Sequence, residues 1–388
     1  MKKVYLDYNA TTPIHPDVAE FAKGFLSDFY GNPSSMHWAG RDVRGFIYEA
    51  RERMARFIKA KPEEVIFTSG GSESDNHAIK GTAFALRDRG SHIITTVVEH
   101  PAVLNTCRYL EEKGFTVTYV PVDSTGLVDP DDIRRAIRAE TILISVMHAN
   151  NETGTVMPIK EIGAIAREHG VLFHSDMVQA MGKLDIDVND MNVDFGAYSG
   201  HKVYAPKGVG VLYMREGLNP DNLIHGGHQE EGRRAGTENA FGIAAFGKAC
   251  EVTQLEMVED MKRIERLRGR LLSGIMEKID GVRLNGNPEM RLPNTLNLTI
   301  EYVESESLLM GLDLNGIAIS AGSACSSGSG EPSHVLLAMG IEPQFCQGSI
   351  RMSLGRGNTD EDIDHVLDVM PGVVERLRQI SPFYKSRP

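Results

Sequence analysis

The chain has 388 residues, and at about 150 residues per domain this length fits two or three domains. Hydrophobic residues make up 41% and charged residues 24%, so a large core is expected and a disordered chain or a small disulfide scaffold is excluded. Lys and Arg number 41 against 53 Asp and Glu, and the net charge of −12 argues against general nucleic-acid binding through phosphates.

No apolar run reaches the ~18 residues that a membrane helix needs. The basic start meets Asp7 before any signal-type apolar stretch forms, so we expect a cytoplasmic protein that does not engage a membrane. The cysteines lie far apart at positions 107, 250, 325 and 346, without a Cys-x-x-Cys pair. This spacing argues against a zinc ribbon or a disulfide framework, and no metal site is expected.

Short β-rich runs alternate with helical patterns between about residues 63 and 213. The expected strands are 65–68, 92–98, 117–120, 142–146, 171–176 and 193–198, and helical patterns fall at 103–110 and 158–169. Strand-helix-strand alternation predicts the α/β class, with a mainly parallel sheet covered by helices on both sides.

The C-terminal third has a different pattern, which predicts a smaller α+β domain. A long amphipathic helix is expected over 257–280, with one apolar stripe formed by Val258, Met261, Ile264, Leu267, Leu271 and Ile275. Segments 282–301 and 348–354 are expected to be strands. The last helix begins with a capping-box pattern at 359–362, and Pro371-Gly372 is expected to kink or interrupt it.

Two charged residues at strand ends carry the first functional hypothesis. Lys202 closes Ser199-Gly200-His201-Lys202 directly after an expected strand, and Asp176 ends another strand, with Gln179 close behind. A lone lysine there would usually be a surface residue. A lysine together with an acid at the carboxyl edge of a parallel sheet matches what pyridoxal phosphate needs, an amine for a Schiff base and a carboxylate for the pyridine nitrogen.

Three polar turns are expected at the same sheet edge. Gly70-Gly71-Ser72 joins a strand to a helix start, which either binds an anion such as the cofactor phosphate or merely connects the two elements. His100 could stack on a flat cofactor and pass protons, or simply cap a helix. The turn 150–154, with Asn151, adds amides or is an ordinary turn. Neither a Walker loop nor a Gly-x-Gly-x-x-Gly run is present.

Taken together in chain order, these motifs resemble the cysteine desulfurases of the class V, fold-type I group of pyridoxal-phosphate enzymes, in the branch that serves iron–sulfur cluster assembly and nitrogenase maturation. The matching segments are 5–12, 31–35, 68–76, 148–154, 199–202, 322–325 and 349–356. The resemblance implies a large cofactor-binding domain over 15–256 with a mainly parallel seven-stranded sheet. It also implies a small domain over 1–14 and 257–388 that carries the catalytic cysteine loop.

The resemblance also implies a role for each matching residue. Lys202 would bind the cofactor covalently, Asp176 would pair with the pyridine nitrogen, Gln179 would contact the ring hydroxyl oxygen and His100 would stack on the ring. The phosphate would be bound by Gly71, Ser72, Ser199 and His201, and by Thr237 from the neighbouring subunit, which implies a homodimer. Asn32, Asn151 and Arg351 would hold the substrate carboxylate, and Asn151 would also border the cofactor.

Cys325 lies in the Ser/Gly-rich segment 320–330, where a thiol on a tether could reach the pocket and then swing out. By resemblance it would take sulfur from L-cysteine as a persulfide, release alanine, and pass the sulfur to an acceptor scaffold protein for iron–sulfur clusters. Cys107 and Cys250 are expected in the core, and a role for Cys346 is not favoured. Met177 stands where the family usually has a small alanine, expected beneath the ring.

Alternatives from the same fold are a selenocysteine lyase or a pyridoxal-phosphate aminotransferase, and a different class is a non-catalytic sulfur carrier or scaffold component. An aminotransferase would not need Cys325. A scaffold would not need the pair of Lys202 and Asp176.

Overall fold

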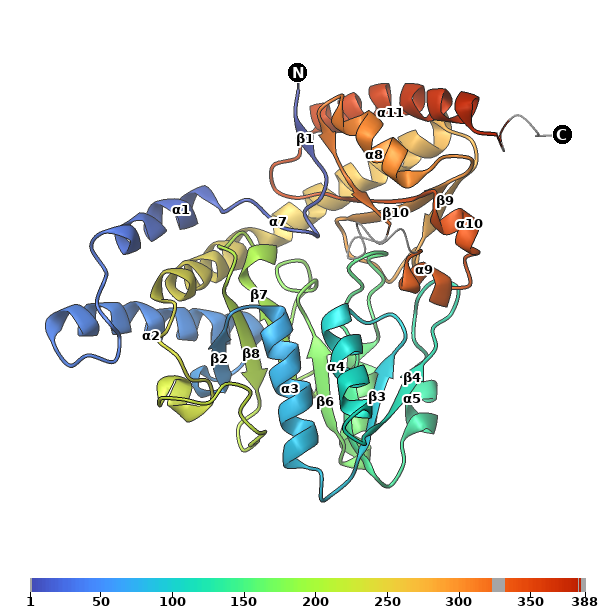
Figure 1. Ribbon diagram of the computed structural model, residues 1–388. Helices are drawn as coiled ribbons and strands as arrows, with labels where there is room; N and C mark the ends of the chain where they lie inside the picture. Colours follow the sequence, from blue (N-terminus) through green and yellow to red (C-terminus); the bar gives the residue numbers. More distant parts are fainter. Residues whose placement is uncertain (1, 323–331, 383, 385–388) are drawn as a thin grey trace.

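The larger part of the molecule is built on a seven-stranded sheet (Figure 1). The computed structural model describes residues 2–322, 332–382 and 384. The strand order is β2-β8-β7-β6-β5-β3-β4, with bounds β2 Val65–Thr68, β3 His92–Thr96, β4 Thr116–Val120, β5 Thr141–Ser145, β6 Leu172–Asp176, β7 Phe195–Ser199 and β8 Gly210–Met214. Only β8 runs antiparallel to its neighbours β2 and β7. The expected α/β class and mainly parallel sheet are confirmed.

Both faces of this sheet are buried, which explains why its strands are apolar at successive positions. In β3, Ile93 packs in one hydrophobic cluster while Ile94 packs in another, and Tyr213 and Met214 of β8 divide in the same way. Successive side chains of a strand point to opposite faces, so a strand covered on both sides has no polar face. The covering helices include α2 Trp38–Ile58, α3 Gly71–Ala85, α4 Pro101–Glu111, α5 Pro130–Ala136 and α6 Ile159–His169.

The remaining helical elements connect these layers or lie at their ends. They are α1 Pro16–Ala22, η1 Lys23–Leu26, η2 Pro62–Glu64, η3 Gly200–Lys202, η4 Gln229–Gly232, α9 His334–Ala338 and α10 Pro343–Cys346. Local sequence explains several helix ends. Proline occupies the first position of α1, α4 and α5, where no backbone donor is needed. Gly170 ends α6 in the left-handed conformation, with φ of 65°.

A second, smaller unit lies at the top of Figure 1 and has its own core. Its antiparallel sheet has the order β12-β13-β10-β9, and β1 pairs with β11 in parallel. The bounds are β1 Val4–Tyr5, β9 Val282–Asn285, β10 Thr295–Ile300, β11 Ile317–Ala318, β12 Ser320–Ala321, β13 Ser349–Ser353, α8 Ser305–Asp313 and α11 Asp360–Ile380. Val4 and Leu6 pack in the same cluster as Ile264 and Leu296, so the start of the chain belongs to this core.

Helix α7, Ala240–Lys278, runs from the larger unit into the smaller one. Met257 packs against the core of the larger unit and Ile264 lies in the core of the smaller one. The expected domain boundary at 256/257 therefore falls inside a continuous helix, and it stays a prediction.

One expectation about the C-terminal helices is wrong, and of the kink or interruption expected at Pro371 the interruption is wrong while the kink stays a prediction. Val258 was expected on the buried stripe of α7, but 59% of it is exposed, because it lies where the helix passes from one core to the other. Pro371 does not interrupt α11, which continues from Asp360 to Ile380. Met370, Val373 and Val374 are all buried around the proline, so packing holds the helix together there. The capping box at Thr359 is confirmed.

Among the described residues, no helix has both the length and the apolar composition needed to cross a bilayer.

Candidate active site

A cavity of about 320 Å³ opens at the carboxyl edge of the large sheet. Segments that follow β1, β2, β3, β5, β6 and β7, together with β13, all reach it. Its lining includes these residues that were expected at the site: Gly71, Ser72, His100, Asn151, Asp176, Gln179, Ser199, His201, Lys202 and Arg351. The remaining lining residues are Asn9, Ala10, Asp75, Met147, Ala149 and Val178.

Lys202 and Asp176 reach this cavity from neighbouring parallel strands. The Nζ of Lys202 donates to the carbonyl oxygens of Asn9 at 2.5 Å and Ala10 at 2.8 Å. Asp176 is buried at the end of β6, and its Oδ1 accepts a hydrogen bond of 3.0 Å from the backbone of Val178. Burial raises the pKa of Asp176, and the nearby His100 and Lys202 oppose that rise. Asp176 is therefore a buried acid placed near Lys202 and the imidazole of His100.

The first turn of α3 borders the cavity with Gly71 and Ser72. Helix α3 begins at Gly71, and its amino-terminal N–H groups lack partners within the helix. A Cβ at Gly71 would lie 2.7 Å from Cγ2 of Val178, so only glycine leaves this approach open. His201 contacts Thr11 Oγ1 through Nδ1 at 3.2 Å, and burial lowers its pKa to about 4, with a smaller effect from Lys202 and Lys207.

His100 caps a helix and also faces the cavity, and its stacking on a cofactor stays a prediction. Its Nδ1 accepts a hydrogen bond of 3.1 Å from the backbone N–H of Ala102, which caps the start of α4. The ring also lines the cavity. Burial lowers the pKa of His100, while Asp176 raises it. Because Nδ1 accepts, Nε2 carries the proton and is the nitrogen that is left to act in the cavity.

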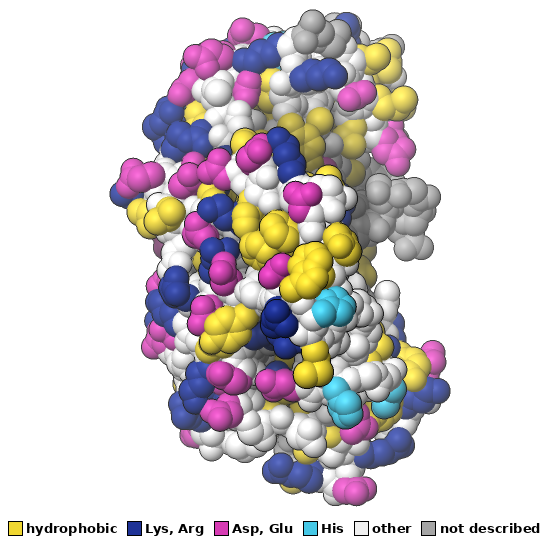
Figure 2. Space-filling view, turned by 90° about the vertical axis from the view of Figure 1, so that its left-hand side faces the viewer, with side chains coloured by type: hydrophobic (Ala, Val, Ile, Leu, Met, Phe, Trp, Pro, Cys, Tyr) yellow, Lys and Arg dark blue, Asp and Glu magenta, His cyan; other side chains and the backbone are white. Residues whose placement is uncertain are grey.

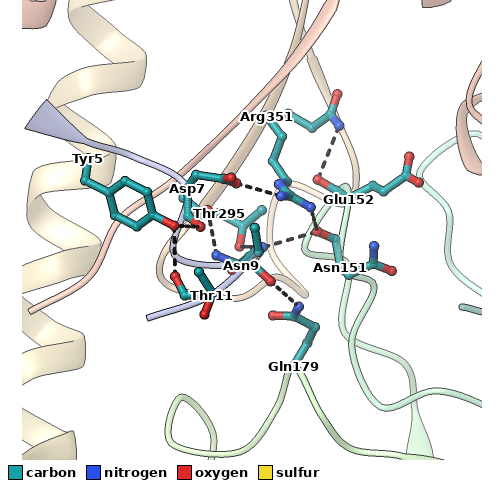
Figure 3. Close-up of polar contacts among 12 residues, drawn as sticks. Tyr5, Asp7, Asn9, Thr11, Asn151, Glu152, Gln179, Thr295 and Arg351 are labelled. Atoms are coloured by element: carbon teal, nitrogen blue, oxygen red, sulfur yellow. Dashed lines mark hydrogen bonds and ion pairs between the residues drawn. The ribbon is translucent and has the colours of Figure 1, made fainter. Parts of the chain in front are cut away.

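Arg351 is held from two sides in a buried position (Figure 3). Its Nη2 donates to Oδ1 of Asp7 at 2.7 Å, and its Nη1 donates to the carbonyl oxygen of Asn151 at 3.0 Å. Within the part of the chain that the structure describes, its Nε has no hydrogen-bond partner. Each terminal nitrogen uses only one of its two N–H groups in these bonds, so the guanidinium keeps donors for the cavity that it lines.

Asn9 joins the parts of the site, as Figure 3 shows. Its side-chain Nδ2 donates to Thr295 Oγ1 at 2.9 Å and to the carbonyl oxygen of Asn151 at 3.2 Å. Its backbone oxygen accepts from Gln179 Nε2 at 3.0 Å and from Lys202. Asn9 was not singled out from the sequence, although it lies in the segment 5–12 that carried part of the resemblance.

Two expected residues are not brought to this cavity. Asn32 precedes α2, and its Oδ1 accepts from the backbone N–H of Ser34 at 2.9 Å. Thr237 is exposed on the segment before α7. Cys325 lies outside the described residues. The roles of these three residues stay predictions.

The expectation that Met177 lies beneath the ring is wrong. Met177 is fully buried in the core of the larger unit, and its Sδ accepts from the hydroxyl of Tyr198 at 3.0 Å. Val178 lines the cavity instead. Strand β6 ends at Asp176, and the turn that follows, held by Oδ1 of Asp176, presents Val178 and Gln179 to the cavity, while Met177 packs into the core.

Further buried acids lie behind the cavity. Burial raises the pKa of Asp75 well above its usual range, and Asp176 and Glu99 add to the rise. Its Oδ1 lies 3.4 Å from Nε2 of His174, whose pKa burial lowers to about 3, so His174 is uncharged near pH 7 and this contact is not an ion pair. Burial likewise raises the pKa of Glu99 to about 8 and that of Glu152 to about 7.

The three described cysteines are buried. Cys107 and Cys346 are buried in α4 and α10, and Cys250 is buried in α7. Burial raises the pKa of Cys107 to about 12 and also raises the pKa of Cys250 and of Cys346. A reactive thiol needs its thiolate form, which these environments disfavour. Within the described ranges, no group of three or more His, Cys, Asp or Glu side chains could hold a metal ion.

Comparison with known proteins relates this geometry to a family. Residues 4–366 match the family described as aminotransferase class V. The cysteine desulfurase IscS of Dictyoglomus turgidum is 52% identical over 382 residues, which cover 98% of this chain and 97% of that protein. A solved structure of a NifS-like protein superimposes with a TM-score of 0.91 at 38% identity, covering 97% of this chain and 100% of that chain. The structure of SspA in complex with cysteine has a TM-score of 0.81 at 39% identity, covering 91% and 99%.

Proposed function

The chain belongs to the class V aminotransferase family and is a pyridoxal-phosphate-dependent cysteine desulfurase, and we propose that it passes the sulfur of L-cysteine through Cys325 to an acceptor protein for iron–sulfur cluster assembly. The observation that carries this proposal is that Lys202, Asp176 and Arg351 all line one cavity. The relatives favour a desulfurase over a selenocysteine lyase, an aminotransferase or a non-catalytic carrier.

The residues of the cavity fit pyridoxal phosphate, and the architecture is that of fold type I. The turn before α3 offers backbone N–H groups that can bind a phosphate. A glycine stands there because a Cβ would collide with Val178, so the approach to these N–H groups stays open. Ser199 and His201 add polar groups from the end of β7 and the turn after it. Asp176 is a buried carboxylate whose charged form needs a cationic partner, such as a protonated pyridine nitrogen. Lys202 supplies the amine.

When bound, pyridoxal phosphate supplies the electron sink for a carbanion at the substrate Cα. Asp176 keeps the pyridine nitrogen protonated. Lys202 removes the Cα proton of L-cysteine and later returns one, because an amine is the base that this cavity provides. His100 exchanges protons with the thiols through Nε2, since its Nδ1 is occupied by Ala102.

Arg351 binds the substrate carboxylate. Its guanidinium is fixed by Asp7 and by the carbonyl oxygen of Asn151, so the remaining donors are oriented before the substrate arrives. Asn151 and Asn32 would complete the contacts to this carboxylate, and Gln179 would contact the ring hydroxyl oxygen of the cofactor. The thiolate of Cys325 then takes the sulfur atom as its C–S bond to the substrate breaks. The product is alanine, and Cys325 carries a persulfide for transfer to the acceptor.

A homodimer is part of the proposal, because an apolar surface lies over α1 and α2. Figure 2 looks at this side of the molecule and shows apolar side chains gathered there. The exposed fractions are 77% for Leu26, 75% for Tyr30, 87% for Met36 and 61% for Trp38. An apolar patch of this kind marks an interaction surface. A second copy would cover it and bring Thr237 to the neighbouring cofactor phosphate. The unpaired thiols of the described cysteines agree with a cytoplasmic location.

Two variants test the chemistry. Lys202→Ala should purify without the visible absorbance of the bound cofactor. Cys325→Ala should keep that absorbance but release no sulfide or alanine from L-cysteine beyond a few per cent of the wild-type rate. Labelled cysteine followed by digestion should place the extra sulfur on Cys325. Unchanged sulfide release from Cys325→Ala would refute the sulfur-transfer assignment.

Sedimentation tests the dimer. Trp38→Arg should produce monomers, whereas Leu314→Arg, at a 75% exposed leucine after α8, should sediment like the wild type. Equal behaviour of the two variants would argue against this face.

A further inference from the structure

The turn that joins β2 to α3 is held in shape by a side chain of its own helix. Oε2 of Glu73 reaches back and accepts a hydrogen bond of 2.9 Å from the backbone N–H of Ser69. Gly71 and Ser72, which lie between these two residues, line the cavity. Glu73 lies in the first turn of α3, where the partial positive charge of the helix start favours an anion. A negative side chain therefore lies in the same turn that we expect to bind a negative phosphate.

Arg234 pairs with this carboxylate. Its Nε donates to Oε1 of Glu73 at 2.8 Å and its Nη2 donates to Oε2 at 3.2 Å, so the guanidinium contacts both oxygens. Both side chains are mostly buried. Burial raises the pKa of Glu73, but hydrogen bonds from Arg234 and Ser69 bring it below its ordinary value, and the bond to Glu73 raises the pKa of Arg234. Both groups are thus charged near pH 7.

Two other basic side chains of this region do not take the place of Arg234. Arg233, its neighbour in the chain, donates to Oε2 of Glu231 at 3.2 Å. His77 is buried in α3, and burial lowers its pKa to about 4, so it carries no charge near pH 7. Arg234 is therefore the cation that compensates Glu73.

We propose that Glu73 and Arg234 are positioning residues for the phosphate of the cofactor: Glu73 fixes the turn whose N–H groups bind the phosphate, and Arg234 compensates the negative charge that Glu73 would otherwise hold against it. This inference rests on the proposed function. A carboxylate left without its partner beside a bound anion is disfavoured by repulsion and by burial. Neither residue was given a role from the sequence.

The test compares the binding of two compounds to the full-length apoenzyme at pH 8, followed by absorbance. Pyridoxal phosphate is one, and the other is pyridoxal, which has the same ring and aldehyde but no phosphate. Arg234→Met leaves Glu73 uncompensated and should raise the Kd of pyridoxal phosphate about tenfold, the order expected for one partly solvated charge. The Kd of pyridoxal should rise less than about threefold. Arg234→Gln is the second neutral variant, in case Arg234→Met does not fold.

Removing the negative charge should reverse this loss. Glu73→Gln keeps an oxygen that can accept from the N–H of Ser69. Added to Arg234→Met, it should bring the Kd of pyridoxal phosphate back to within about threefold of the wild-type value. A merely structural role predicts the opposite, because the loss of contacts in the double variant would then add to the loss in the single one.

Arg215→Met is the matched control. Nε of Arg215 donates to Asp194 at 3.0 Å, and Asp194 also accepts a backbone N–H, from Phe173, at 2.9 Å. This pair precedes β7, at the edge of the sheet opposite the cavity, so both Kd values should match the wild type.

Three results would each overturn the proposal. They are an unchanged Kd of pyridoxal phosphate in both neutral variants of Arg234, an equal rise for pyridoxal phosphate and pyridoxal, and a double variant that binds no more tightly than Arg234→Met alone. Failure of the proposed function looks different, because then Lys202→Ala would keep the visible absorbance whatever residue stands at position 234.

Discussion

Removing the side chain of Asp7 tests whether this carboxylate holds Arg351 in place. The side chain of Arg351 is 2% exposed and that of Asp7 is 21% exposed. The change Asp7→Ala removes the 2.7 Å contact to Nη2 and leaves only the bond from Nη1 to Asn151. The hydroxyl of Tyr5 bonds to the backbone oxygens of Asp7 and Thr11, so the local chain should keep its course.

The magnitude follows from the burial of the pair. Breaking a fully buried ion pair costs about 3–5 kcal/mol, because a charge stays behind without its partner. Here the partial exposure of Asp7 and the remaining bond to Asn151 reduce the cost, so we expect Asp7→Ala to lower the free energy of unfolding by about 2 kcal/mol. Asp7→Asn keeps an acceptor oxygen at the same place and should cost about 1 kcal/mol.

Urea unfolding followed by circular dichroism measures these differences, and steady-state kinetics measures the effect on the site. We expect Asp7→Ala to raise the KM for L-cysteine about tenfold, equivalent to ~1.4 kcal/mol of carboxylate binding, with a smaller change in kcat. The reasoning is refuted if Asp7→Ala matches the wild type in both measurements, or if Asp7→Asn is no milder than Asp7→Ala.

Three further results are expected. Burial raises the pKa of Glu152 from 4.5 to about 7, so the folded state holds a proton that the unfolded chain has lost, and the free energy of unfolding should fall as the pH rises from about 5 to 8. In urea titrations, Glu152→Gln should reduce this fall in the free energy of unfolding by up to ~3 kcal/mol. Part of the pH dependence should remain, because burial also raises the pKa of Glu99. Val178→Ala should weaken cofactor retention about tenfold by absorbance after dialysis, whereas Met177→Leu should not, and equal loss in both would contradict their placement. Cys346→Ala should keep full sulfide release and cost about 1 kcal/mol of stability, and lost activity would instead give this thiol a role.

The sequence alone was sufficient for the features that depend on neighbouring residues. Apolar runs separated by helical patterns identified six of the seven strands of the large sheet, since burial on both faces leaves no polar position in them, and missed β8. Asp176, Ser199 and His100 were recognised because they directly follow or end such strands, and the carboxyl ends of parallel strands meet at one edge. Lys202 follows by the same rule, one short turn after β7.

Only the tertiary structure decided which distant residues support these groups. Asp7 and Arg351 are 344 positions apart and meet because β1 and β13 belong to the same small core. Asn9 donates to Thr295 of the smaller unit and accepts from Gln179 of the larger one, and no local pattern reports such contacts. Packing also turned Met177 into the core. The physical reason is that periodicity determines which face a side chain occupies, whereas its partners depend on how whole elements pack against each other.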